Sequence, residues 1–176
     1  MNELLDSERQ LLVELCGKKL RTLTSRELSG KYHWRADRSQ WREAFVLALA
    51  TAERADEEHR GEGPMYRIRA AQALIELGEV ERAVPLLEDS IARDWAAEPV
   101  LAQNEHFLHS AYTSLFELNF KVTPERARAL FWKANEVFGA PRGFPWVSPV
   151  QDSLRRKLAR AKGWDRERER LAELMG

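Results

Sequence analysis

One stretch, residues 64–94, most constrains the fold of this chain, because it predicts two helices joined by a tight turn. Segments 65–77 and 80–93 both have helical periodicity, and Gly78 lies between them, where the end of a helix favours a residue that tolerates positive φ. Neither helix can bury its apolar face alone, so we expect the two to pack against each other. The facing positions are small or aliphatic: Ala70, Ala73, Leu74, Leu77, Ala83, Val84, Leu87 and Ile91.

The rest of the chain also has helical periodicity, with two interruptions. Apolar spacing predicts helices over residues 2–23, 40–60 and 100–120, and Thr123 followed by Pro124 predicts the start of another that ends at Gly139. Residues 24–39 contain Gly30 and mix aromatic with basic side chains, so they are expected to break the helical period. Residues 139–149 hold three prolines and predict an extended loop. Two further helices are expected within residues 149–175.

The residue spacing in 64–94 resembles the tetratricopeptide repeat, a helix-turn-helix unit of about 34 residues. Small, large and small residues follow the turn glycine at the spacing of that family, and a small residue occupies the matching site of the first helix. These residues are Ala83, Leu87, Ser90 and Ala71, and Ala127, Phe131 and Ala134 repeat the spacing. Two positions depart from the pattern: Arg67 replaces an aromatic residue, and Trp95 replaces the closing proline. The resemblance implies stacked hairpins that bind another polypeptide, and it implies no chemistry.

We therefore predict an all-α fold: a tetratricopeptide-like stack of antiparallel helical hairpins, forming a short right-handed α-solenoid. The 176 residues are expected to form a single domain, with hairpins at about 2–60, 64–94 and 100–138 and a C-terminal capping helix pair at 149–175. The 28 basic and 28 acidic residues balance, so no global charge attracts nucleic acid or an anionic membrane. Any such attraction must be local.

Targeting and redox features predict a cytoplasmic protein. The start MNELLDSERQ carries acidic residues where a secretory signal has basic ones, and the longest apolar run, residues 44–52, is about half the length that crosses a bilayer. We therefore expect no membrane partner. The single cysteine, Cys16, lies among leucines and is interpreted as a small core residue.

Candidate catalytic and metal sites are weak. The sequence has no glycine-rich phosphate loop, no GxSxG nucleophile and no paired CxxC motif. His106 and His109 share a helix face with Glu105, but no motif supplies the further ligands that a metal site needs. We expect no enzyme activity, no metal and no cofactor. In an aromatic-rich helix, such histidines are more often hydrogen-bonded groove or core residues.

Polypeptide binding is the preferred function, because the first helices of stacked hairpins line a shared concave surface. The expected partner-binding residues combine aromatic, Met and Arg side chains, a composition typical of interfaces: Met65, Ile68, Arg69, Gln72, His109, Tyr112, Phe116, Asn119 and Trp146. Tyr112 and Phe116 could instead pack against the capping helices, and Trp146 could anchor the proline-rich loop. Adaptors, chaperones and toxin-neutralising immunity proteins all fit this pattern.

The alternative function is RNA or DNA binding, or regulation, by the basic C-terminal helices. Arg155, Arg156 and Arg160 form the alternative patch, and residues 31–35 could present a ring that stacks on a base. Alternating Arg and Glu in residues 165–171 also fits an exposed helix with internal ion pairs.

Overall fold

The computed structural model describes residues 4–138 and 156–175, which are helical and contain no β-strand. The all-α prediction is therefore confirmed for this part of the chain. Its helices divide into two compact units, residues 1–111 and residues 112–176, each described by itself below. The single-domain expectation stays a prediction.

Unit 1 is built around α3 (Trp41–Glu57), which packs between α2 (Ser25–Ala36) and α4 (Gly63–Glu76) and also contacts α1 (Asp6–Cys16). Every side chain from Ala44 to Ala52 is buried, because helices cover α3 on several sides. Thr51 is tolerated there since its hydroxyl donates to the Leu47 carbonyl at 2.6 Å. Burying a large apolar side chain such as Phe45 contributes about 1.5–3 kcal/mol to the free energy of unfolding.

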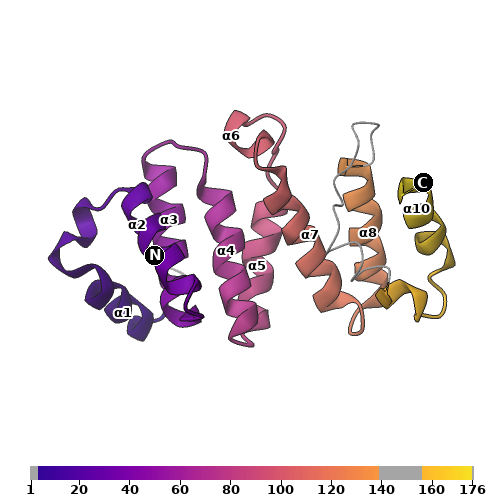
Figure 1. Ribbon diagram of the computed structural model, residues 1–176, viewed down its shortest axis with the longest axis horizontal. Helices are drawn as coiled ribbons and strands as arrows, with labels where there is room; N and C mark the ends of the chain where they lie inside the picture. The colour runs from indigo at the N-terminus through magenta and orange to yellow at the C-terminus, as the bar shows by residue number, and fades with distance from the viewer. Residues whose placement is uncertain (1–3, 139–155, 176) are drawn as a thin grey trace. The chain divides into compact units, whose positions relative to one another are not determined.

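The predicted central hairpin is α4 followed by α5 (Val80–Ile91), which Figure 1 shows as an antiparallel pair. Gly78 lies in the turn with a φ of +77°, as expected for a residue that ends a helix in the left-handed conformation. The small side chains Ala71, Ala73 and Ala83 are buried and let the helices approach closely.

The prediction for residues 24–39 was wrong, because they form α2 rather than a break. Thr24 caps this helix, accepting from the Glu27 N–H, while the Glu27 carboxylate accepts from the Thr24 N–H at 2.8 Å. The hairpin before α4 is therefore α2 with α3. The first helix also ends earlier than predicted: α1 stops at Cys16, and a 3₁₀ turn, η1 (Gly17–Thr22), follows at Gly17, whose φ is +62°.

The predicted helix over residues 100–120 is divided into α6 (Pro99–Ala102) and α7 (Glu105–Asn119), and α7 passes from unit 1 into unit 2. Unit 2 continues with α8 (Pro124–Phe138), a helical segment at 156–159 and α10 (Asp165–Met175). Its core contains a group of rings in which Trp164 lies 5.8 Å from Phe116 and 5.0 Å from Phe120. The predicted loop 139–149 and the start of the capping pair lie outside the described residues.

In the parts of the chain that the structure describes, no helix has both the length and the apolar character needed to cross a membrane.

Candidate partner-binding surfaces

A cluster around Arg69 joins three helices of unit 1: α2, α4 and the first half of α7. The Arg69 guanidinium of α4 lies over three rings, at 5.3 Å from the Tyr32 centroid, 5.4 Å from Tyr66 and 4.8 Å from Phe107. These rings belong to α2, α4 and α7. Because the faces of aromatic rings carry negative potential, they stabilise the cation in a half-buried position.

Polar contacts extend this cluster along the same three helices. Arg69 lies 2.9 Å from Nε2 of His33 in α2, and the Tyr66 hydroxyl lies 2.5 Å from the Ser29 hydroxyl. These contacts join α2 to α4. The environment of the cluster also shifts two pKa values. Burial and the Arg69 charge lower the pKa of His33, and burial raises the pKa of Tyr32.

A similar contact joins α4 to α7, since Gln72 donates to the Ser110 hydroxyl at 2.6 Å. We call this surface of α2, α4 and the first half of α7 the Arg69 face. Three of the predicted groove residues, Met65, Arg69 and Gln72, are half-buried on α4.

Four other predicted groove residues are not open to a partner. Ile68 is fully buried, and Tyr112 and Phe116 are each 3% exposed. Phe116 packs against Trp164, which corrects the groove expectation in favour of packing against the C-terminal part. Asn119 is also buried and donates to the Leu115 carbonyl at 2.8 Å. The physical reason is that α7 is apolar around most of its circumference, so burial extends beyond one stripe.

The histidine predicted at the groove is buried too. His109 is 9% exposed, and burial, with a smaller effect from the neighbouring His106, lowers its pKa to about 4. It is therefore neutral at pH 7. Within residues 4–138 and 156–175, no group of three or more His, Cys, Asp or Glu residues could hold a metal ion. Two further predicted residues, Trp146 and Arg155, lie outside the described residues.

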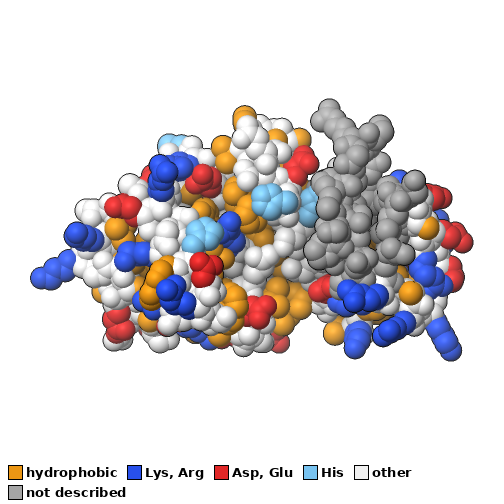
Figure 2. Space-filling view, viewed as in Figure 1, with side chains coloured by type: hydrophobic (Ala, Val, Ile, Leu, Met, Phe, Trp, Pro, Cys, Tyr) orange, Lys and Arg blue, Asp and Glu red, His pale blue; other side chains and the backbone are white. Residues whose placement is uncertain are grey.

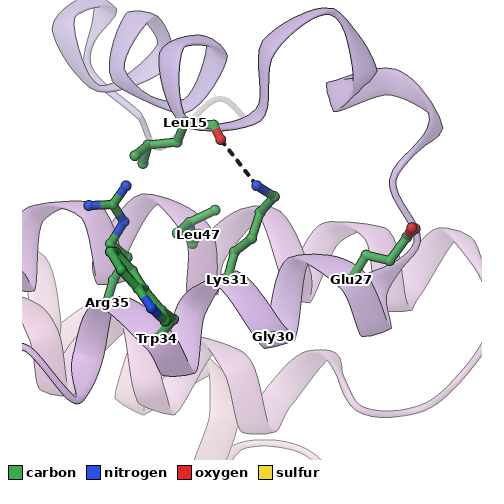
Figure 3. Close-up of a pocket in the computed structure, with 7 residues that line it drawn as sticks. All are labelled: Leu15, Glu27, Gly30, Lys31, Trp34, Arg35 and Leu47. Atoms are coloured by element: carbon green, nitrogen blue, oxygen red, sulfur yellow. Dashed lines mark hydrogen bonds between the residues drawn. The ribbon is translucent and has the colours of Figure 1, made fainter.

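A pocket of about 430 Å³ lies on a different side of α2 and is shown in Figure 3. We call it the α2 pocket. It is lined by one residue of α1, five of α2 and one of α3: Leu15, Glu27, Gly30, Lys31, Trp34, Arg35 and Leu47. Figure 3 shows Lys31 and Arg35 reaching from α2 toward Leu15, with Leu47 between them. Lys31 donates to the Leu15 carbonyl at 3.3 Å, near the C-terminus of α1, where a cation is favoured.

The side chain of Trp34 stands at the edge of this pocket and is 48% exposed. The guanidinium groups of Arg35 and Arg38 lie over its ring, at 4.6 and 4.0 Å from the centroid. The sequence predicted a loop here in which a ring could stack on a base. The structure instead has a helix, and the chain's own cations lie over the indole.

A basic groove lies in unit 2, with a cavity volume of about 830 Å³. Its lining combines four cations with apolar residues and one carboxylate: Glu117, Leu118, Phe120, Lys121, Val122, Arg156, Lys157, Arg160 and Ala161. Lys157 pairs with Glu117 at 2.7 Å, which joins α7 to the segment at 156–159. Figure 2 shows Lys and Arg side chains gathered where this unit contains the α7–α8 turn.

Two of the three predicted basic residues, Arg156 and Arg160, therefore meet at this groove. Sequence reasoning missed Lys121, Phe120 and Val122, because the turn between α7 and α8 brings them there and no periodic pattern places a turn beside a distant helix. Charge per unit could have drawn attention to the region. Residues 112–176 contain 13 Lys and Arg against 8 Asp and Glu, whereas residues 1–111 contain 15 against 20.

Comparisons with protein-family models, with curated proteins and with solved structures found no match to this chain. Its function has to be inferred from the three surfaces above.

Proposed function

We propose that this chain is a non-catalytic protein–protein interaction module with a tetratricopeptide-like stack of helical hairpins. Burial at the repeat positions supports the proposal: Ala71, Ala83, Leu87 and Ser90 are each fully enclosed. Ser90 donates to the Leu86 carbonyl at 2.8 Å, so burying its hydroxyl leaves that donor paired.

The second set of small-large-small residues supports the same proposal. Ala127, Phe131 and Ala134 are buried along α8, at the spacing found in α5. Repetition of one packing pattern in both units is what a repeat architecture requires, since each hairpin buries its apolar side against a neighbour.

The observation that carries the proposed activity is the Arg69 face. There α2, α4 and the first half of α7 contribute side chains to one surface. In stacked-hairpin proteins, the first helices of successive hairpins bind extended polypeptides with a surface of this kind. The exposed and half-buried groups, including His33, Met65 and Gln72, offer apolar area and hydrogen-bonding atoms to a peptide. An adaptor, a chaperone and an immunity protein would all use such a surface.

The test selects peptides from a random display library on the purified full chain and measures their affinity by fluorescence polarisation. His33→Ala, Met65→Ala and Gln72→Ala should each weaken binding about tenfold. The thermal midpoint should fall by no more than a few degrees, because each change removes at most one contact between helices. Matched controls lie on the second helix of the central hairpin: Glu81→Ala and Pro85→Ala should change affinity less than about twofold. Failure to select any binding peptide, or equal losses in both sets, would refute the proposal.

A second candidate is contact with RNA or DNA at the basic groove. The favouring observation is that Lys121, Arg156 and Arg160 meet there in a unit whose sequence is net basic. Binding to a single-stranded oligonucleotide should then fall steeply with salt and be lost in Arg156→Glu with Arg160→Glu. Lys133→Glu, an exposed charge reversal on α8 of the same unit, is the control and should weaken binding far less.

A further inference from the structure

Gly30 has no structural role that the chain itself requires. It lies inside α2, where glycine destabilises a helix relative to alanine because it leaves the unfolded backbone more freedom. Its φ is not in the left-handed region, and an added Cβ would meet no atom within 4 Å. Neither backbone conformation nor packing therefore explains the glycine. It does line the α2 pocket, where the missing side chain keeps space open.

The space beside Gly30 has an apolar floor. Leu15 and Leu47 line it from α1 and α3, and the indole of Trp34 borders it. A volume of about 430 Å³ lies within the range of roughly 300–1,000 Å³ found for pockets that hold small ligands. It can therefore admit a large apolar side chain of a partner.

The rim of the pocket is cationic. Lys31 and Arg35 line it, and Arg38 lies beside it, with its guanidinium and that of Arg35 over the exposed Trp34 ring. In the described part of the chain, none of these three cations forms an ion pair with a carboxylate. The single lining carboxylate, Glu27, is already held by the Thr24 N–H and hydroxyl. Unit 1 is net acidic as a whole, so this rim is a local reversal of charge. Such a rim favours an anionic ligand.

We propose that the α2 pocket binds an acidic polypeptide segment, with one large apolar side chain inserted beside Gly30. Carboxylates on either side of that residue pair with Lys31, Arg35 and Arg38. The inference rests on the proposed polypeptide-binding function, but it uses a side of α2 other than the Arg69 face. A peptide fits better than a nucleic acid, because a stacking base would have to displace the guanidinium groups from the indole and the pocket floor is aliphatic.

The experiment measures, by fluorescence polarisation, binding of the full chain to a labelled peptide with one Phe between pairs of Glu. Two comparison peptides replace the Phe with Ala or each Glu with Lys, and both should bind at least about tenfold more weakly. Gly30→Leu fills the pocket and should reduce affinity by at least about tenfold while keeping or raising the thermal midpoint, because leucine favours helix. Arg38→Glu should also weaken binding, with a reduced dependence on salt.

The matched control is Ala129→Leu, which adds the same side chain at an exposed position inside α8 and should leave affinity unchanged. Equal binding by Gly30→Leu and the unaltered chain would overturn the pocket proposal and leave the polypeptide function intact. Absence of any binding by the labelled peptide would overturn the pocket proposal too, and if no library peptide binds the chain, the proposed function fails as well. Binding of a single-stranded oligonucleotide that Gly30→Leu abolishes, with no peptide binding, would assign the pocket to nucleic acid and overturn the proposal.

Discussion

Arg82 of α5 donates two hydrogen bonds of 2.8 Å to the two carboxylate oxygens of Glu8 in α1, across 74 residues of sequence. Glu8 is 3% exposed and also accepts from Arg42 of α3 at 2.7 Å and from the Leu5 N–H at 2.9 Å. Burial alone would raise the pKa of this carboxyl group, but these donors outweigh burial and lower it. One buried carboxylate thus holds α1, α3 and α5 together.

Replacing this carboxylate should destabilise unit 1. Glu8→Gln removes one of two carboxylates that Arg42 and Arg82 share, and Glu79 still pairs with both arginines. We therefore expect a loss in the free energy of unfolding near the lower end of the roughly 3–5 kcal/mol for breaking a buried pair. Urea unfolding followed by circular dichroism measures it. Asp6→Asn, which removes an exposed pair with Arg9 in the same helix, should cost less than about 0.5 kcal/mol. Equal effects of the two changes would contradict a structural role for Glu8.

The same pair predicts a pH dependence. Because the pKa of Glu8 is lower in the folded state than its ordinary value of 4.5, its contribution is complete above that value and is lost as the pH falls through the folded pKa. The difference in unfolding free energy between the unaltered chain and Glu8→Gln should therefore shrink below about pH 4.5. A constant difference down to pH 3 would rule this out.

His109 should titrate near pH 4. Burial lowers its pKa from 6.5 to about 4, so the unfolded chain binds this proton at a higher pH than the folded chain does. Stability should therefore fall as the pH drops from 6.5 towards 4, and His109→Gln should show a shallower fall. Proton resonances of the imidazole ring, followed by NMR, give the midpoint directly. A midpoint at 6.5 would show that the ring is solvated.

Phe116 should behave as a core residue. Its ring lies 5.8 Å from Trp164 and 6.4 Å from Phe131, so Phe116→Ala should cost about 3–5 kcal/mol in the free energy of unfolding. Val137→Ala on the exposed side of α8 is the control and should stay within about 0.5 kcal/mol. If Phe116→Ala left the free energy of unfolding unchanged, Phe116 would not be a core residue and would instead line an open groove.

Gly78 should resist substitution for backbone reasons. Its φ of +77° disfavours a residue with a Cβ, although an added Cβ would meet no atom within 4 Å. Gly78→Ala should therefore cost about 1–2 kcal/mol in the free energy of unfolding, and Gly78→Asn less, because asparagine tolerates this conformation. Thermal melts compare the two. Equal midpoints for all three chains would show that the turn adopts another conformation.

Helix positions could be predicted where apolar periodicity was long and the ends carried turn or capping residues. Pro124 begins α8 as predicted, and α10 lies within residues 149–175, where two further helices are predicted. The missed helix, α2, has weak periodicity, but its sequence contains a capping box in Thr24 and Glu27 that could have revealed it. The prediction gave more weight to Gly30 and to the mixed aromatic and basic residues, which disfavour a helix. Tertiary contacts nevertheless stabilise α2 despite its weak intrinsic helix preference.

By itself, the sequence determined the helical class, the central hairpin and its turn at Gly78, because these depend on contacts between residues close in the chain. Only the tertiary structure decided that Phe116 is enclosed, that Glu8 reaches Arg82, and that Gly30 opens onto Leu15 and Leu47. Helical periodicity tells which side chains share a face of one helix. Whether that face meets another helix or the solvent depends on how segments distant in sequence pack, and no local pattern contains that information.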